Sequence, residues 1–328
     1  MMHRRHLLLA PAALLAAPAL LPAALAQGSF PNRPIRLIVA FPAGGPTDVL
    51  ARVIGERMAT ELGQPVVIEN RGGANGNIAA EAVSKLDPDG YALLYNTSSI
   101  AISRALYKRL AYDVQRDLVP VALTAAAPSL LVVNPQQPAR NAAEFASWAK
   151  ANSGKISYSS GGVGNISHLQ AYMLMRNLGA EAVHVPYRGT AAALTDVAAG
   201  NVQFMIDAFN TALPLAREGR VRAIAVTTNR RSAQLPDIPT LAETGLMPPG
   251  FDLGIWQGIM APARTPPEVV ARLNQAVNAA LRDPGVAARV DQMGAWPTGG
   301  SPADYKTYLD AELALWARVV PETGASEE

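Results

Sequence analysis

The sequence predicts an α/β fold, in which strands and helices alternate and form parallel sheets that helices cover on both faces. One observation is the segment 35–52, where an apolar, β-branched run passes through a Pro/Gly-rich turn directly into a helical pattern. Another is that the same order of strand, Gly-rich loop and helix recurs from Lys155 onward. Such alternation with short loops is typical of sheets whose strands are connected by helices.

The expected elements follow from the spacing of apolar residues and from the turn residues between them. In the first series the strands are expected at 35–40, 65–69 and 91–95, and the helices at 46–62 and 76–86. In the second series the strands are expected at 155–159, 183–187, 202–207 and 221–227, and the helices at 166–178, 190–199 and 211–218. Amphipathic helices are expected near 266–282, 284–293 and 302–320.

Two further apolar runs, 130–133 and 254–260, lie outside these series and are candidates for strands that cross between two lobes. Such crossings would make the first domain discontinuous. We therefore expect domain 1 to comprise residues 27–128 and 250–328, and domain 2 to comprise residues 129–249. Each domain would be a doubly wound α/β unit.

The first 26 residues have the pattern of an export signal. A basic head with Arg4 and Arg5 precedes an Ala/Leu/Pro tract at 7–25, and 24–26 is a small-x-small cleavage site. Three prolines and this site argue against a membrane anchor. We expect cleavage near Ala26 and a periplasmic protein. The two arginines leave both the general secretory and the twin-arginine routes open.

The composition excludes several classes of function. Without the two arginines of the signal, 26 Lys and Arg face 26 Asp and Glu, so a nucleic-acid-binding role has no support. There is no cysteine, which excludes thiol catalysis, thiolate metal sites and disulfides. Neither a Gly-x-Ser-x-Gly nor a His-Glu-x-x-His motif occurs. No catalytic residue, metal or cofactor is therefore expected.

The loop at 41–48 has the chemistry of an anion site. Gly44 and Gly45 allow the backbone to approach a ligand closely. Pro46 suits a first helical turn, and Thr47 and Asp48 follow it. Free N–H groups at the positive end of a helix dipole bind anions, and the Lys-Ser/Thr pair of a P-loop is missing. The loop therefore favours a small carboxylate over a nucleoside triphosphate.

The second Gly-rich loop, 159–169, offers hydroxyl, amide and N–H groups. It is either a second ligand-binding loop, facing the first across a cleft, or a strand–helix turn that Asn165 or Ser167 caps. His168 either orients this loop or contacts the ligand, with the former favoured. Because open α/β sheets bind ligands at the carboxyl ends of their strands, the two loops would meet at one cleft.

Other strand ends carry polar residues with two interpretations each. Ser98 either caps a helix or donates a hydroxyl to the ligand. Arg188, next to Tyr187, either pairs with a second carboxylate or points to solvent. Asp207 either caps the following helix or accepts a hydrogen bond from the ligand. The loop 70–77 either lines the mouth of the cleft or is a structural turn.

These loops resemble the extracytoplasmic receptors of tripartite tricarboxylate transporters, often called the Bug family. The resemblance runs through nearly the whole mature chain, in a specific order and spacing. The matching segments are 30–31, 34–39, 41–48, 65–71, 88–91, 158–164, 167–169, 185–189, 236–240 with Glu243 and Gly245, 256–258 and 261–262. The sequence departs from the family pattern at Arg264, where the family has Gly, and at Gly73 and Asn75.

The resemblance implies a type II periplasmic-binding-protein fold, with two domains joined by crossing strands around a ligand cleft. It implies capture of a carboxylate by main-chain amides and bridging waters more than by an Arg clamp. Carried onto this sequence, it places one end of the ligand at Phe41, Ala43, Gly44, Gly45, Thr47 and Asp48. It places the other end at Ser159, Ser160, Gly164, Asn165, His168 and Asp207.

The expected function is that of a periplasmic receptor, which captures a small organic carboxylate and delivers it to a tripartite tricarboxylate-type transporter in the membrane. One alternative is a ligand sensor whose partner is a two-component kinase. Another is a secreted enzyme on the same fold, with Asp48 or His168 as acid and base. The sequence does not identify the acid.

Overall fold

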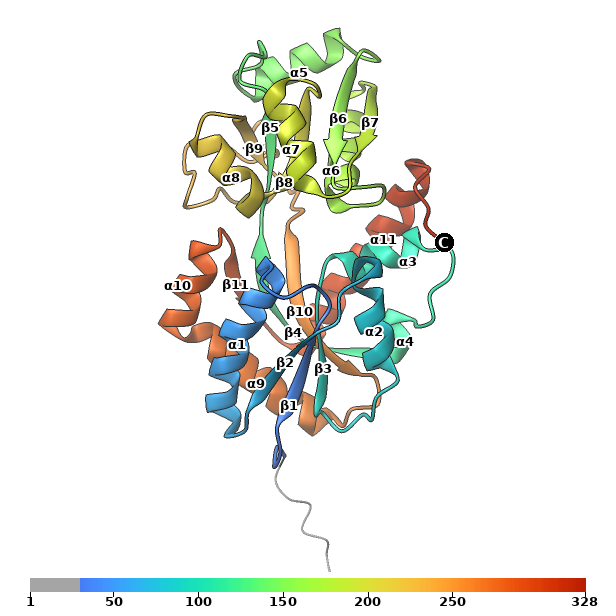
Figure 1. Cartoon of the computed structure of the whole chain (residues 1–328), viewed down its shortest axis with the longest axis vertical. Coiled ribbons are helices and arrows are strands. Elements are labelled where there is room, and N and C mark those ends of the chain that lie inside the picture. Colours follow the sequence, from blue (N-terminus) through green and yellow to red (C-terminus); the bar gives the residue numbers. More distant parts are fainter. Residues whose placement is uncertain (1–29) are drawn as a thin grey trace, which may run out of the picture.

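A computed structural model describes residues 30–328. The predicted signal peptide and its cleavage site lie outside these residues. The described part of the chain contains two sheets, one above the other in Figure 1. We call the part built on the six-stranded sheet the first lobe and the part built on the five-stranded sheet the second lobe. No helix among the described residues is long and apolar enough to cross a membrane.

The first lobe contains the N-terminal and C-terminal parts of the described chain. Its strands, in spatial order, are β11 (Trp296–Gly299), β4 (Leu118–Ala127), β10 (Ile255–Pro262), β3 (Ala92–Thr97), β1 (Ile35–Val39) and β2 (Val66–Asn70). Its helices are α1 (Pro46–Leu62), α2 (Asn77–Ser84), α3 (Ser99–Leu106), α4 (Val114–Asp117), α9 (Pro267–Arg282), α10 (Pro284–Gln292) and α11 (Pro302–Glu322). A 3-10 turn, η1 (Ala74–Gly76), precedes α2.

The second lobe is built from a continuous stretch of the chain. Its strands, in spatial order, are β7 (Ala182–Pro186), β6 (Ile156–Ser160), β8 (Phe204–Ala208), β5 (Ser129–Val133) and β9 (Arg222–Val226). Its helices are α5 (Ala142–Ala151), α6 (Ile166–Leu178), α7 (Thr190–Ala199) and α8 (Phe209–Arg217).

The sheets, predicted to be parallel, are mixed, because the strands on either side of each crossing are antiparallel to their neighbours. β1, β2 and β3 are parallel, but β10 is antiparallel to both β3 and β4. In the second lobe, β5 is antiparallel to β8 and β9. The reason is the direction in which the chain enters each lobe. β10 and β5 begin at the junction and run away from it, whereas β1, β3, β6 and β8 end there (Figure 1).

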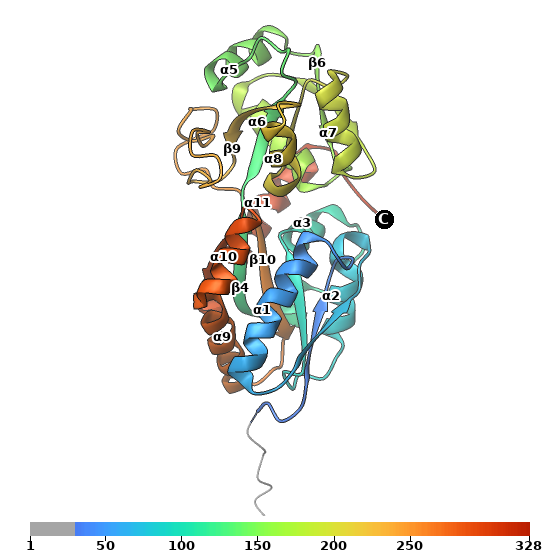
Figure 2. The same ribbon diagram turned by 60° about the vertical axis from the view of Figure 1, so that its left-hand side comes forward.

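The chain changes lobes twice. β4 ends at Ala127 and β5 begins at Ser129, so Pro128 is the first crossing. The second crossing is at the end of the segment between β9 and β10. The earlier part of this segment packs on the second lobe, where Thr240 pairs with Val226 and Leu241 and Leu246 join the core. The run 130–133 is therefore a strand of the second sheet and does not itself cross, whereas β4, which precedes it, was not predicted. Both views show the extended crossing segments between the lobes (Figures 1 and 2).

Each sheet is covered on both faces, which explains its apolar strands. On β1, Ile35, Leu37 and Val39 pack on the side of α1, α9 and α10, and Ile38 packs on the side of α2, α3 and α11. The alternation follows the two-residue period of a strand. In the second lobe α5 and α6 cover one face of the sheet, and α7 and α8 cover the other.

The two lobes also touch at two glycines. A Cβ atom built on Gly164, in the second lobe, would lie 2.4 Å from the side chain of Leu106 in α3. A Cβ on Gly294, which follows α10 in the first lobe, would lie 2.4 Å from the ring of Phe209 in α8. The absence of a side chain at each position therefore permits the lobes to approach this closely.

Candidate ligand-binding site

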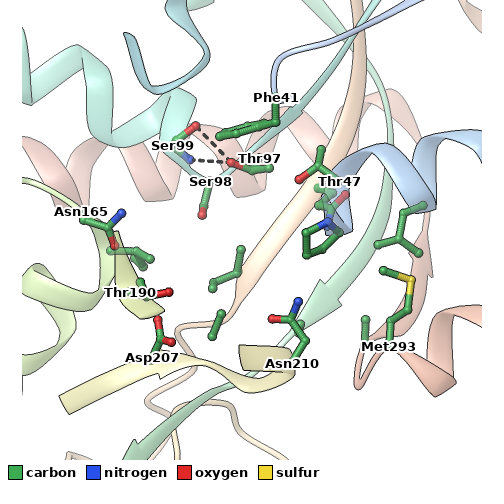
Figure 3. Close-up of a pocket in the computed structure, with 18 of the residues that line it drawn as sticks. Phe41, Thr47, Thr97, Ser98, Ser99, Asn165, Thr190, Asp207, Asn210 and Met293 are labelled. Atoms are coloured by element: carbon green, nitrogen blue, oxygen red, sulfur yellow. Dashed lines mark hydrogen bonds between the residues drawn. The ribbon is translucent and has the colours of Figure 1, made fainter. Parts of the chain in front are cut away.

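A cavity of about 240 Å³ lies between the lobes. This volume is below the ~300–1,000 Å³ of pockets for drug-sized ligands, so it suits a small molecule. Figure 3 shows residues of both lobes around it, with Phe41, Thr47 and Ser98 on one side and Asn165, Thr190 and Asp207 on the other. The apolar part of its lining comprises Phe41, Pro46, Leu50, Ile102, Ala127, Ile166, Ala208, Ile255, Met293 and Ala295.

Among residues 30–328, five helices begin at this cavity. Their first or second residues line it: Pro46 and Thr47 of α1, Ser99 of α3, Ile166 of α6, Thr190 of α7 and Asn210 of α8. The first N–H groups of a helix have no partner within the helix, and together with the helix dipole they give its N-terminus a partial positive charge. Five such ends around one cavity favour an anion as its ligand.

Asp207 is the one charged side chain in the lining, as far as the described residues show. It lies at the end of β8, is 2% exposed, and accepts a hydrogen bond from the hydroxyl of Thr211. Burial raises the pKa of Asp207 to about 6, although hydrogen bonds from Thr211, Ala208 and Thr190 oppose the shift. No Lys or Arg of residues 30–328 lines the cavity, so the positive ends of the helices are the groups there that attract an anion.

The loop 41–48 reaches the cavity through only part of its length. Phe41, Pro46 and Thr47 line it, whereas Ala43, Gly44 and Gly45 do not. The sequence led us to expect a free N–H at Gly44. Instead this N–H donates to Oδ2 of Asp48, at a distance of 2.9 Å.

Asp48 lies behind this loop and holds it in place. Its carboxylate also accepts from Nε of Arg52 at 3.0 Å and from Nδ2 of Asn70 at 2.9 Å, and Asn70 donates to the carbonyl oxygen of Phe41 as well. Burial alone would raise the pKa of Asp48, but the hydrogen bonds from Arg52, Gly44 and Asn70 outweigh it and lower that pKa. Asp48 is therefore an ionised anchor outside the cavity lining.

The second loop contributes Asn165 to the cavity, and Asn165 also caps α6. Its carboxamide oxygen accepts from the N–H of Ser167 at 3.0 Å and from its hydroxyl at 2.9 Å. The two interpretations of this residue are therefore compatible. Gly164 is not in the lining, and its φ of +69° is a conformation that favours glycine.

His168 lies behind the second loop and contacts its backbone. Its Nδ1 accepts a hydrogen bond from the N–H of Gly164 at 3.2 Å, which is the contact of a loop-orienting residue. The ring stacks on His184, with a distance of 3.8 Å between ring centroids. Burial and the neighbouring His184 lower the pKa of His168 to about 4, and burial lowers the pKa of His184 to about 4.

Two serines precede this loop and are buried. The hydroxyl of Ser159 donates to the carbonyl oxygen of Ala193 at 3.3 Å. The hydroxyl of Ser160 lies 2.6 Å from Nε2 of His184, a distance that a nucleophile and its base would also show. Ser160 is 0% exposed and is not part of the cavity lining, so a ligand in the cavity does not reach it.

Three more predicted residues lie at the edge of β3 and after β7. Ser98 lines the cavity, beside Thr97 and Ser99. Tyr187 and Arg188 do not line it. The hydroxyl of Tyr187 donates to Asp196, and the Arg188 side chain is exposed. The structure therefore brings together Phe41, Thr47, Ser98, Asn165 and Asp207, and it leaves the other predicted residues behind or beside the cavity.

Several lining residues had no predicted role. Thr190 and Asn210 follow strand ends and could have been found by asking which helices begin there. Gln257 lies in a run that was recognised only as an apolar strand. Met293 and Ala295 are far from every Gly-rich loop in the sequence, and no local signal marks them.

A second cavity, of about 600 Å³, lies between α6, α11 and the segment 247–253. It meets the last turn of α6, at Arg176 and Asn177, and the C-terminal half of α11, at Leu315, Arg318 and Val319. The C-terminal end of a helix carries a partial negative charge. Unlike the first cavity, this one is lined by two arginines, Arg176 and Arg318, and by no first turn of a helix among the described residues.

Comparison with solved structures places this architecture among periplasmic binding proteins. The structure of R. palustris Rpa4515 with adipate has a TM-score of 0.77 and 37% identity, over 90% of this chain and 99% of that one. MatC (Rpa3494) from Rhodopseudomonas palustris with bound malate has a TM-score of 0.73 and 37% identity, over 89% of this chain and 100% of that one. The predicted α/β fold of this type is confirmed.

The family follows from the sequence comparisons. The sequence profile described as "Tripartite tricarboxylate transporter family receptor" matches residues 50–325. Protein BugT of Bordetella pertussis is 36% identical over 305 residues, which are 92% of this chain and 93% of BugT. This chain belongs to the tripartite tricarboxylate transporter receptor family of periplasmic solute-binding proteins. The predicted resemblance is confirmed.

Proposed function

We propose that this protein is a periplasmic receptor that binds a small organic carboxylate between its two lobes and delivers it to a tripartite tricarboxylate-type transporter. The observation that carries the proposal is the convergence, within the described chain, of five helix N-termini on a cavity that none of its Lys or Arg residues lines. Charge-assisted hydrogen bonds from such N–H groups are each worth on the order of 1.5–3 kcal/mol. A few of them supply the ~8 kcal/mol of micromolar affinity.

The relatives support the same chemistry. Rpa4515 was solved with adipate and MatC with malate, and both are small dicarboxylates. In this chain the carboxylate binds at the N-termini of α1 and α3, with Thr47 and Ser98 as hydroxyl donors. Asn165 and Asp207 contact the other end of the ligand from the second lobe.

Other predicted residues support the ligand-binding loops without contacting the ligand. Asp48 and Gly44 shape the loop that carries Phe41 and Thr47. His168 and Gly164 shape the loop that carries Asn165. Residues 27–128 and 250–328 then move as one domain, and residues 129–249 as the other, when the lobes close around the acid.

A binding panel tests the receptor function. The mature protein, refolded from denaturant to remove any bound acid, is mixed with mono-, di- and tricarboxylates and with the methyl esters of each hit. Ligand at 100 Kd stabilises a protein by about 2.7 kcal/mol, which raises the melting temperature by several degrees. A shift that disappears on esterification supports a carboxylate receptor. No shift with any acid would refute it.

Delivery to a transporter needs a separate test in cells. Uptake of the radiolabelled acid is measured in strains that lack this receptor, the membrane subunits of the transporter, or both. We expect each single deletion to abolish the same uptake and the double deletion to add nothing. Normal uptake without the membrane subunits would restrict the function to binding.

A further inference from the structure

We propose that the acid binds together with a proton, and that the carboxyl group of Asp207 receives this proton. The inference rests on the proposed function, because it concerns an acid in the same cavity. The sequence led us to expect that Asp207 caps a helix or accepts a hydrogen bond from the ligand. Neither of these roles involves a change in its charge.

The position of Asp207 makes its charge matter for binding. Asp207 lines the cavity at the end of β8 and is 2% exposed, and Figure 3 shows its carboxyl group close to Thr190. The carboxyl accepts hydrogen bonds from Thr211, Thr190 and the N–H of Ala208, which favour its charged form. Burial outweighs these bonds and raises the pKa of Asp207 to about 6. At neutral pH the empty cavity therefore contains a carboxylate that is close to taking a proton.

The elements that pack against β8 bring no charged side chain to Asp207, as far as the described residues show. β5 carries no ionisable residue, and burial raises the pKa of Tyr158 on β6, so Tyr158 stays neutral. His168 and His184 are neutral at pH 7, because the pKa of each is about 4. Arg188, which precedes α7, is exposed and outside the lining. The other ionisable side chains of α6, α7 and α8 lie beyond the first turn of each helix, and they are Tyr172, Arg176, Asp196 and Arg217. A charged Asp207 therefore has no counter-ion on these elements.

A bound acid brings a second negative charge close to Asp207. A sphere with the volume of the cavity, about 240 Å³, is roughly 8 Å across, which does not exceed the Debye length at physiological salt. Repulsion between the two charges therefore acts wherever the acid lies in the cavity, and it needs no contact between them. Asp48, on the side of the first lobe, is already paired with Arg52 outside the lining.

The proton resolves this repulsion. A like charge favours the neutral form of a carboxyl group, so binding of the acid raises the pKa of Asp207 further. The carboxylate of Asp207 takes one proton from the solvent and becomes a carboxylic acid, and no other bond changes. The acid keeps its own charge, which the helix N-termini stabilise.

Isothermal titration calorimetry in phosphate and in Tris buffer measures this proton, because the two buffers release different heats when they give one up. The probes are adipate, malate and the acid of the binding panel that binds most tightly. At pH 7 we expect the wild-type protein to take up roughly 0.4 of a proton or more for each acid bound. By linkage, its affinity should fall about 2.5-fold or more from pH 6.5 to pH 7.5. Binding without proton uptake would overturn the proposal. Release of a proton would also overturn it, because Asp207 would then pair with a cationic group of the ligand.

The variant Asp207→Asn keeps the shape of the side chain but cannot take up a proton. We expect it to bind the acid without proton uptake and with the same affinity at pH 6.5 and pH 7.5. Asp196→Asn is the matched control, because Asp196 lies on α7 in the same lobe but outside the cavity lining. This control should take up as many protons as the wild type. Undiminished uptake in Asp207→Asn would overturn the proposal, because the proton would then reach another group.

Infrared spectroscopy of the wild-type protein covers a failure of Asp207→Asn to fold, which circular dichroism would detect. Aspartate labelled with ¹³C in its carboxyl group separates the absorption of the protein from that of the acid. We expect the band of a protonated, labelled carboxyl to grow when the acid is added at pH 7, and its absence would overturn the proposal. If no acid of the panel binds, the proposed function fails and this inference fails with it. If acids bind without proton uptake, only the role of Asp207 fails.

Discussion

The rings of His168 and His184 lie face to face, 3.8 Å apart between centroids and 4° apart in plane. One ring accepts from the backbone of Gly164 and the other contacts the hydroxyl of Ser160. Two protonated rings would repel each other at this distance. The pair therefore holds the second loop only while both rings are neutral.

This pair predicts a loss of stability in acid. In the folded protein the pKa of each histidine is lowered to about 4, against about 6.5 in an unfolded chain. Between these values the unfolded chain binds more protons, so the free energy of unfolding falls as the pH falls. We expect a loss of roughly 1–3 kcal/mol from pH 6.5 to pH 4.5, measured by urea denaturation. The double variant His168→Asn, His184→Gln should lose less over the same range, and parallel pH profiles would contradict the prediction.

Asp207 predicts a pH dependence of opposite sign. Its pKa is raised to about 6 in the folded protein, against about 3.9 in an unfolded chain. Between these values the folded protein binds more protons, so this group lowers the free energy of unfolding as the pH rises from 4 to 6. The variant Asp207→Asn should gain stability over the wild type by roughly 2 kcal/mol across that interval. A difference that is constant from pH 4 to pH 7 would refute the raised pKa.

The variant Asp48→Asn should weaken binding of a carboxylate although Asp48 is not in the cavity lining. It loses the charge that accepts from Gly44, Arg52 and Asn70, so we expect a loss of about 1–3 kcal/mol in stability and at least fivefold in affinity. The control is Asp304→Asn, which weakens the exposed cap of α11. The control should lower the melting temperature slightly and leave the affinity unchanged. Equal affinities for both variants would show that the loop does not depend on Asp48.

The glycines between the lobes predict which substitutions hinder closure. Gly164→Ala and Gly294→Ala place a Cβ against Leu106 and Phe209, so the lobes should stand further apart. Gly179→Ala is the control, because its φ is also positive but nothing lies within 4 Å of the added atom. All three variants share the backbone strain, of about 1 kcal/mol. Only the first two should bind a carboxylate more weakly and show a larger radius of gyration by X-ray scattering with the acid present.

Much of the fold could be predicted because its helix boundaries are encoded locally. α1 begins at Pro46 and ends before Gly63, and α6 and α7 end before Gly179 and Gly200, all three glycines having positive φ. These helices have the predicted bounds. β4 was missed because its sequence is rich in alanine and includes a proline. It is a strand because β10 and β11 pair with it, and such pairing is not visible in the segment itself.

The candidate site was predictable only where polar residues directly follow a strand. Phe41, Ser98 and Asp207 stand at such ends and line the cavity. Ser159, Ser160 and His168 belong to the same kind of segment but point into the second lobe, and the sequence contains no signal for that direction. Gln257 faces the cavity because side chains alternate along β10 and its neighbour Trp256 packs in the core of the first lobe. That core forms only in the folded protein, so the sequence did not indicate the position of Gln257.

The position of β10 has a consequence for the order of assembly. β10 lies between β3 and β4 in the six-stranded sheet, yet the whole second lobe precedes it in the chain. The second lobe is one uninterrupted stretch, so all its strands are present once residue 226 has been added. During synthesis from the N-terminus, the five-stranded sheet can therefore be completed before the six-stranded sheet, although its first strand comes later in the sequence. The six-stranded sheet, whose strands β1 to β4 come earlier in the chain, lacks its central strand until β10 has been added.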